Sequence, residues 1–119
     1  MDSLSQLEWK NRVVLVFGQT YDEKVLQQID LLKSKENELA DRDMVIIRVS
    51  VNEVHAVYGK ASGLDASAIR REAHMRDERF KVLLIGKDGD VKLRSDRIVG
   101  ATEMFGLIDS MPMRNAEKG

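Results

Sequence analysis

The sequence predicts an α/β fold in which helices flank a central four-stranded mixed sheet. Residues 13–17 and residues 44–51 are nearly continuous aliphatic runs, the pattern of strands that are buried on both faces. A helical pattern from residue 22 to about residue 39 joins them into a strand–helix–strand unit, whose crossover is expected to be right-handed. Residues 81–94 have the pattern of an antiparallel hairpin, and one more helix follows it.

The first part of the chain supplies a short helical turn and the first long helix. Leu4 and Leu7 fall on one face of a turn that begins at Ser3. After the first strand, Thr20 or Asp22 is suited to cap the next helix, because either side chain can accept a hydrogen bond from a backbone amide of the first turn. The apolar stripe expected to face the sheet consists of Val25, Ile29, Leu32 and Leu39.

The middle of the chain is less regular. Residues 52–64 show no clean hydrophobic period, and we expect them to be mostly irregular. Asp65 then has the character of an N-cap for a short helix that ends near residues 74–76.

The end of the chain predicts a helix and then a tail. Gly100 stands at the N-cap position of a helix over residues 101–111, and Pro112 ends it. We expect residues 113–119 to form a frayed polar tail of a single domain that spans residues 1–119.

The hairpin gives the clearest local signal. Asp88 and Gly89 suit a two-residue type I′ turn, which needs a positive φ at both positions. The first strand is apolar on both faces, as an inner strand should be, and the second is apolar on one face only, as an edge strand guarded by lysine should be. The pairs expected across the turn are Lys87 with Asp90, Gly86 with Val91, Ile85 with Lys92, and Leu84 with Leu93.

Composition narrows the function classes. Basic residues number 19 and acidic residues 20, so there is no general attraction to nucleic acid or to anionic lipid. The chain has no cysteine, which excludes disulfides, thiolate metal sites and thiol–disulfide oxidoreductase activity. No apolar run reaches the roughly 18 residues that a membrane span needs. The first residues lack the pattern of a signal peptide, which fits either a cytoplasmic protein or the mature form of an exported, periplasmic one.

Several segments resemble a known family. They are residues 9–12 (WKNR), residues 83–89 (LLIGKDG), residues 91–95 (VKLRS), residues 108–109 (ID) and residues 111–114 (MPMR). Over about residues 4–114 the chain resembles a domain of unknown function found in small bacterial proteins and in animal sushi-repeat-containing and coiled-coil-domain-containing matrix proteins. The resemblance implies a thioredoxin-like fold, which the expected order β-α-β-α-β-β-α also indicates, and it supplies no catalytic residues. Its bacterial members often resemble exported proteins.

The position of the thioredoxin active site offers one candidate ligand loop. Thiol chemistry would need a cysteine at the start of the first crossover helix, where this chain has the loop 18–23. Backbone amides there favour an anion, whereas the acidic residues at the same helix end favour simple capping. The candidate ligand loop comprises Thr20, Tyr21, Asp22, Arg79 and Phe80.

Basic residues of the hairpin offer a second candidate surface. Lys87, Lys92 and Arg94 fit either a solvated edge or a docking edge for a protein or glycan partner that carries acidic groups. His55 and His74 are the only imidazoles and stand too far from other donors to predict a metal site, and no cofactor is expected. The leading hypothesis is a non-catalytic interaction module. The alternatives are a cysteine-independent enzyme that uses the loop after the first strand, and a structural domain that oligomerises.

Overall fold

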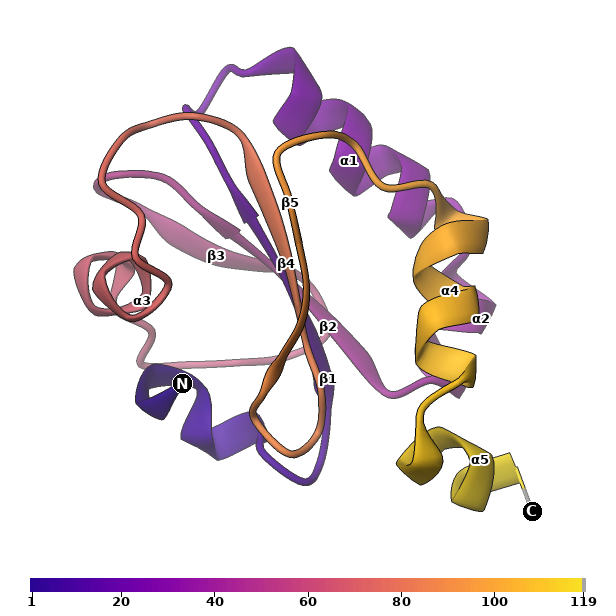
Figure 1. Ribbon diagram of the computed structural model, residues 1–119. Helices are drawn as coiled ribbons and strands as arrows, with labels where there is room; N and C mark the ends of the chain where they lie inside the picture. The colour runs from indigo at the N-terminus through magenta and orange to yellow at the C-terminus, as the bar shows by residue number, and fades with distance from the viewer. Residues whose placement is uncertain (119) are drawn as a thin grey trace.

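A computed structural model describes residues 1–118 of the chain, and its centre is a mixed sheet with helices on both faces (Figure 1). The strands are β1 (Arg12–Phe17), β2 (Met44–Val49), β3 (Val54–Tyr58), β4 (Lys81–Ile85) and β5 (Val91–Ser95). They are ordered β3-β2-β1-β4-β5 across the sheet. β1 runs parallel to β2, and the other three neighbouring pairs are antiparallel. The predicted α/β class and mixed sheet are therefore confirmed.

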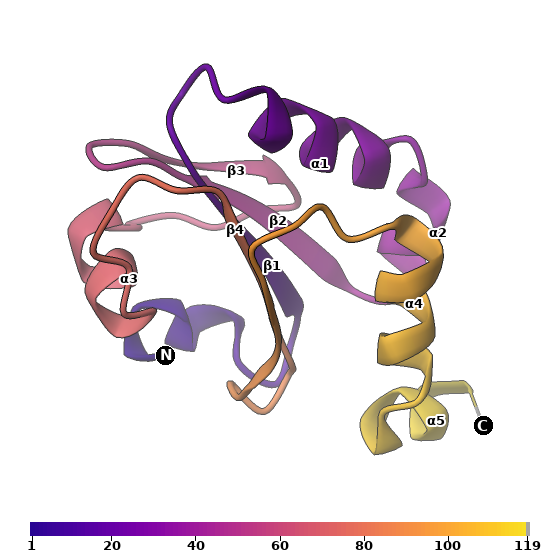
Figure 2. The ribbon, with the colours of Figure 1, turned by 45° about the horizontal axis from the view of Figure 1, so that its top comes forward.

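Helices form a layer on each face of the sheet (Figure 2). The helices are η1 (Asp2–Leu7, a 3₁₀ helix), α1 (Glu23–Lys33), α2 (Glu36–Asp41), α3 (Ala66–Glu72), α4 (Ala101–Asp109) and α5 (Pro112–Lys118). α1, α2 and α4 pack on one face, and η1 and α3 pack on the other. Within residues 1–118, no helix combines the length and hydropathy needed to span a bilayer.

β1 lies in the middle of the sheet, and its side chains alternate between the two layers. Val14 and Val16 pack against the layer of α1, α2 and α4, whereas Val13 and Leu15 pack against the layer of η1 and α3. Val14 pairs with Ile46 of β2 on one side and with a β4 leucine on the other. Each fully buried aliphatic side chain contributes about 1.5–3 kcal/mol of transfer free energy. This strand therefore requires cover on both faces.

The segment 52–64, expected to be irregular, contains a fifth strand. β3 pairs with β2 and raises the expected four strands to five. Its residues are exposed or only partly buried, and Val57 is left unpaired where the register shifts. A short, half-exposed edge strand of this kind need not show strict alternation, which is why the pattern was not visible in the sequence.

The first long helix is two helices in the structure. Asp22 is its N-cap, since the Oδ1 atom accepts a hydrogen bond of 2.9 Å from the backbone amide of Lys24. The helix ends at Lys33, and Lys35 adopts a non-helical backbone before α2 begins. Leu39 of α2 nevertheless lies in the same core cluster as the α1 stripe. The predicted stripe is buried, although the helix that carries it is interrupted.

The hairpin forms with a different turn. Gly89 alone has a positive φ, 86°, and its amide donates to the carbonyl of Gly86, as in a type I turn followed by a left-handed residue. Gly86 therefore lies opposite Asp90, and Ile85 opposite Val91. These pairs differ by one residue from those expected, and Leu84 still faces Leu93. Asp-Gly is compatible with both loop lengths, so the sequence pattern could not separate them.

The expected polar tail is largely helical. The predicted helix over 101–111 ends earlier, at Asp109, and Pro112 does not stop it but begins α5, a position where the missing N–H of proline costs nothing. Arg114 of this helix is buried, with 4% of its surface exposed. Gly119, the last residue of the expected tail, lies outside the described residues.

We predict that Leu84→Ala lowers the free energy of unfolding by about 2–5 kcal/mol, because it opens a cavity between β4 and the α4 layer. Leu84 is 0% exposed and lies in that core cluster. Chemical denaturation measures the change. Val91→Ala on β5, where the side chain is 49% exposed, is the matched control and should cost under about 1 kcal/mol. Equal losses in the two variants would contradict the assignment of β4 as inner and β5 as edge strand.

Candidate functional site

A cleft of about 640 Å³ opens at the end of the sheet where β1 finishes and β4 begins. Phe17 and Lys81 are paired at this end. The cleft is lined by Asp22, Lys24, His74, Met75, Arg76, Asp77, Arg79, Phe80, Lys81 and Asp96. Close packing beside it depends on Gly18, since a Cβ atom there would stand 2.5 Å from a methyl carbon of Val25. The end of β1, the start of α1 and the segment before β4 therefore lie close together.

The predicted ligand loop is only partly assembled around this cleft. Asp22, Arg79 and Phe80 line it, whereas Thr20 and Tyr21 do not. The Tyr21 side chain is 90% exposed. The Thr20 carbonyl accepts a hydrogen bond from the Arg48 guanidinium. Asp22 is engaged in capping α1, as described above.

The cleft is lined by charges of both signs, four basic side chains and the three carboxylates Asp22, Asp77 and Asp96. Lys24, Arg76 and Lys81 have no side-chain hydrogen bond or ion pair anywhere in residues 1–118. Arg79 lies 3.6 Å from Asp77, and both side chains are largely exposed. Such an exposed pair contributes little stability. The cleft therefore offers several cations that are not neutralised by the protein itself.

Metal binding finds no support in the described part of the chain. No group of three or more His, Asp or Glu side chains there could hold a metal ion. His74 lines the cleft, and its backbone adopts a left-handed conformation with φ 59°. His55 lies on β3 and pairs with Glu53 instead.

The predicted basic edge of the hairpin is divided by the structure. Lys92 forms an ion pair of 2.8 Å with Asp88, and this hydrogen bond lowers the pKa of the Asp88 carboxyl. The guanidinium of Arg94 donates to the carbonyl of Ala73 beyond α3. Lys87 is only 8% exposed and points to a cluster of carboxylates, so it does not belong to a solvent-exposed edge. The extra residue in the turn, compared with the predicted type I′ hairpin, places Lys87 in the loop rather than opposite Asp90.

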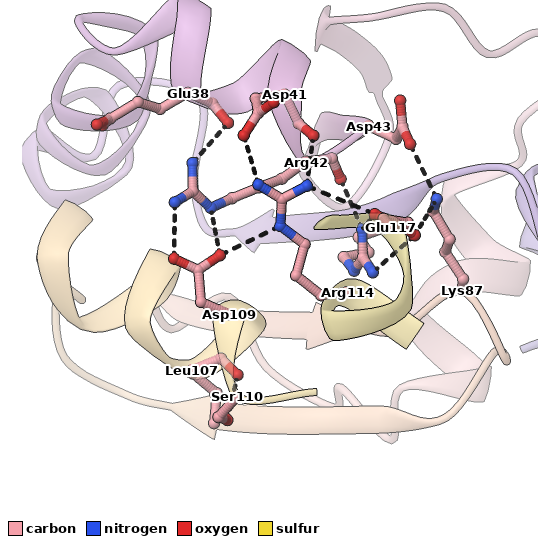
Figure 3. Close-up of polar contacts among 11 residues, drawn as sticks. Glu38, Asp41, Arg42, Asp43, Lys87, Leu107, Asp109, Ser110, Arg114 and Glu117 are labelled. Carbon is pink, nitrogen blue, oxygen red and sulfur yellow. Dashed lines mark hydrogen bonds and ion pairs between the residues drawn. The ribbon is translucent and has the colours of Figure 1, made fainter. Parts of the chain in front are cut away.

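A network of ion pairs between buried cations and partly exposed carboxylates lies at the opposite end of β1 and β4 from the cleft (Figure 3). Asp109 of α4 joins two parts of it: it accepts from Arg42 at 2.8 Å and from Arg114 at 3.3 Å. Arg42 also stacks over the ring of Phe105, 4.6 Å from its centre. The cations of the network are Arg12, Arg42, Lys87 and Arg114, and the carboxylates are Asp41, Asp43, Asp109 and Glu117.

Glu117 of α5 forms the densest contacts of this network. Its two carboxylate oxygens accept from the Arg12 Nη1 and Nη2 atoms at 3.2 and 3.1 Å, and Lys87 Nζ donates to Oε2 at 2.7 Å. Burial alone would raise the pKa of Glu117, but the hydrogen bonds from Arg12 and Lys87 outweigh it and lower the pKa to about 2. The carboxylate is therefore held in its charged form.

Sequence reasoning missed this network because its cations stood among ordinary surface patterns. Arg12 precedes an aliphatic run, and Lys87 belongs to a turn. Arg114 falls in the segment that was expected to be a polar tail. The available signal was indirect: the segments WKNR, LLIGKDG and MPMR, which carry the family resemblance, each contribute one of these three cations.

The comparisons with known proteins give one result. The model of a domain of unknown function, DUF4174, matches residues 3–117. The chain belongs to this family. Searches against curated proteins and against solved structures gave no match. The expected resemblance to a domain of unknown function is confirmed to that extent.

We predict that Glu117→Gln lowers the free energy of unfolding at pH 7 by about 1–3 kcal/mol, because Arg12 and Lys87 lose their shared carboxylate. The pKa of Glu117 in the folded state lies below the ordinary glutamate value of 4.5, so this stabilisation is present above about pH 4.5 and is lost as the pH falls toward 2. Denaturant unfolding of both proteins from pH 7 to pH 2 measures the difference.

The matched control is Glu103→Gln on α4, an exposed residue without a side-chain partner in the described part of the chain. It should change stability by less than about 0.5 kcal/mol at every pH. A Glu117→Gln difference that stays constant down to pH 2 would show that the lost carboxylate charge is not the cause.

Proposed function

We propose that this DUF4174 domain is a non-catalytic, thioredoxin-like binding module whose ligand site is the cleft at the end of β1. The thioredoxin-like relationship is supported by the adjacent strands β2, β1, β4 and β5 and by the helix that crosses over from β1 to β2. In this proposal β3 is an addition at the edge. With no cysteine in the chain, the loop before α1 binds rather than exchanges thiols.

The observation that carries the proposal is the set of unpaired cations around an apolar base. Lys24, Arg76 and Lys81 approach the cleft from three different segments of the chain. Met75 and Phe80, which are buried, provide apolar lining between them. A volume of about 640 Å³ is in the range of ligand-binding clefts.

The ligand class follows from this lining. Unpaired cations attract a segment rich in Asp or Glu and speed its association. The apolar base favours a large hydrophobic side chain in the middle of that segment. We therefore propose an acidic peptide segment of a partner protein as the ligand, with an apolar residue at its centre.

The rival hypothesis of a cysteine-independent enzyme receives less support from the geometry. It uses the loop Thr20-Tyr21-Asp22 together with Arg79 and Phe80, yet the two hydroxyl-bearing side chains, Thr20 and Tyr21, do not line the cleft. The basic hairpin edge also loses one of its three residues, because Lys87 is buried, while Lys92 and Arg94 remain available for a test.

We expect the triple variant Lys24→Glu, Arg76→Glu, Lys81→Glu to weaken binding of an acidic probe at least about tenfold, equivalent to about 1.4 kcal/mol. The probe is a fluorescent decapeptide of Asp and Glu with one central Phe, followed by anisotropy at low and at physiological salt. The wild-type affinity should fall with increasing salt, because exposed charges are screened.

The matched control is the double variant Lys92→Glu, Arg94→Glu on the hairpin edge, which should change the affinity less than about twofold. A larger loss in the control than in the triple variant would place the binding surface at the edge instead. A sulfated heparin oligosaccharide is tested in the same way. If it binds more tightly than the peptide and responds to the variants in the same way, the ligand class is a glycan rather than an acidic peptide. Turnover of any substrate that Tyr21→Phe abolishes in a folded protein would favour the enzyme.

A further inference from the structure

Helix α5 is attached to the rest of the domain by charge rather than by apolar contact. Of its residues 112–117, only Arg114 is buried, and Met113 is 39% exposed. A helix of seven residues is not stable by itself in water. Its position therefore depends on the ion pairs that Arg114 and Glu117 make with other elements, visible around these two labelled residues in Figure 3.

The two cations that bind the Glu117 carboxylate, Arg12 and Lys87, lie in the body of the fold, which here means the domain without α5. Arg12 stands at the start of β1, and Lys87 stands in the turn between β4 and β5. The guanidinium of Arg12 is additionally held by the carbonyl of Arg42, at 3.0 Å from Nη1. Lys87 is additionally held by the carboxylate of Asp43, at 2.9 Å from Nζ. Arg12 and Lys87 therefore each keep a contact with the rest of the fold when α5 is displaced.

Arg12 is the group that most requires an anion. It is 1% exposed, and Glu117 is its only carboxylate partner in the described part of the chain. Its Nε atom is buried without any hydrogen-bond partner. Leaving a buried guanidinium without an anion is strongly unfavourable, whereas two parallel hydrogen bonds from its Nη1 and Nη2 atoms to a planar carboxylate match its geometry. The site therefore needs an anion, and nothing in the body supplies one.

We propose that Arg12 and Lys87 form a carboxylate-binding site that Glu117 occupies from within the same chain, with α5 as a displaceable cover. The ligand class is a carboxylate-bearing molecule that accepts two hydrogen bonds from Nη1 and Nη2 of Arg12 and one from Lys87, as Glu117 does now. Such a ligand competes with a tethered carboxylate, whose high local concentration weakens its apparent affinity. Ligand binding and release of α5 are consequently coupled in this proposal. The site is separate from the cleft, since the two lie at opposite ends of β1.

The test uses the full chain and acetate as the probe, with chloride at equal ionic strength as the reference. In the wild type, acetate should accelerate amide hydrogen exchange of α5 saturably and beyond the effect of chloride. Glu117→Ala should bind acetate at least about tenfold more tightly than the wild type, measured from the NMR signals of Arg12 Nε–H and of the Lys87 side chain. Amide spectra of β1 and β4 establish that the body remains folded.

Two further variants decide between a ligand site and a simple structural ion pair. Lys87→Met in the Glu117→Ala background should remove most of the gained acetate affinity, whereas Glu103→Ala on α4 should match the wild type in every measurement. If Glu117→Ala proves unfolded, Glu117→Gln replaces it, because it keeps the shape and removes the charge. The proposal is overturned if α5 exchange responds equally to acetate and chloride, or if removing the Glu117 charge gives no gain in acetate affinity.

Discussion

The burial of β1 on both faces is the constraint on which the rest of this structure depends. An aliphatic strand paired on both edges, to β2 and to β4, leaves no side exposed to water. Each face must then be covered by its own layer of helices, and the two core clusters on either side are the result. The two candidate sites also follow from it. One lies where β1 ends beside Gly18, and the other lies where it begins at Arg12.

Elements with strong periodic patterns could be predicted from the sequence. The two parallel strands, the cap at Asp22 and the last long helix were all visible, because each is governed by local spacing or by one capping side chain. Three features were not. β3 is a half-exposed edge strand, α5 is a helix with almost no apolar face, and the hairpin turn uses residues that suit two loop lengths. In each of these cases tertiary contacts, rather than local pattern, decide the conformation.

The same distinction between local pattern and tertiary contact applies to the candidate sites. Asp22, Arg79 and Phe80 could be placed together because the expected fold brings the loop before α1 close to the segment before β4. Four other lining residues, His74 to Asp77, come from the irregular segment between α3 and β4, for which the sequence offered no geometry, and the rest come from α1, β4 and the loop after β5. Lys87 illustrates the opposite error. A lysine beside an Asp-Gly turn has the pattern of a surface residue, yet the fold points it inward to carboxylates from two other segments.

Arg12 and Glu117 are paired although they stand 105 positions apart in the sequence. The guanidinium of Arg12 is therefore synthesised well before the carboxylate that neutralises it. Until Glu117 is present, the positive charge of Arg12 at the start of the central strand has no carboxylate partner, and burying such a charge unpaired is strongly unfavourable. Within the described residues Glu117 is the only carboxylate paired with Arg12, so that end of the central strand acquires its counter-charge only when α5 docks.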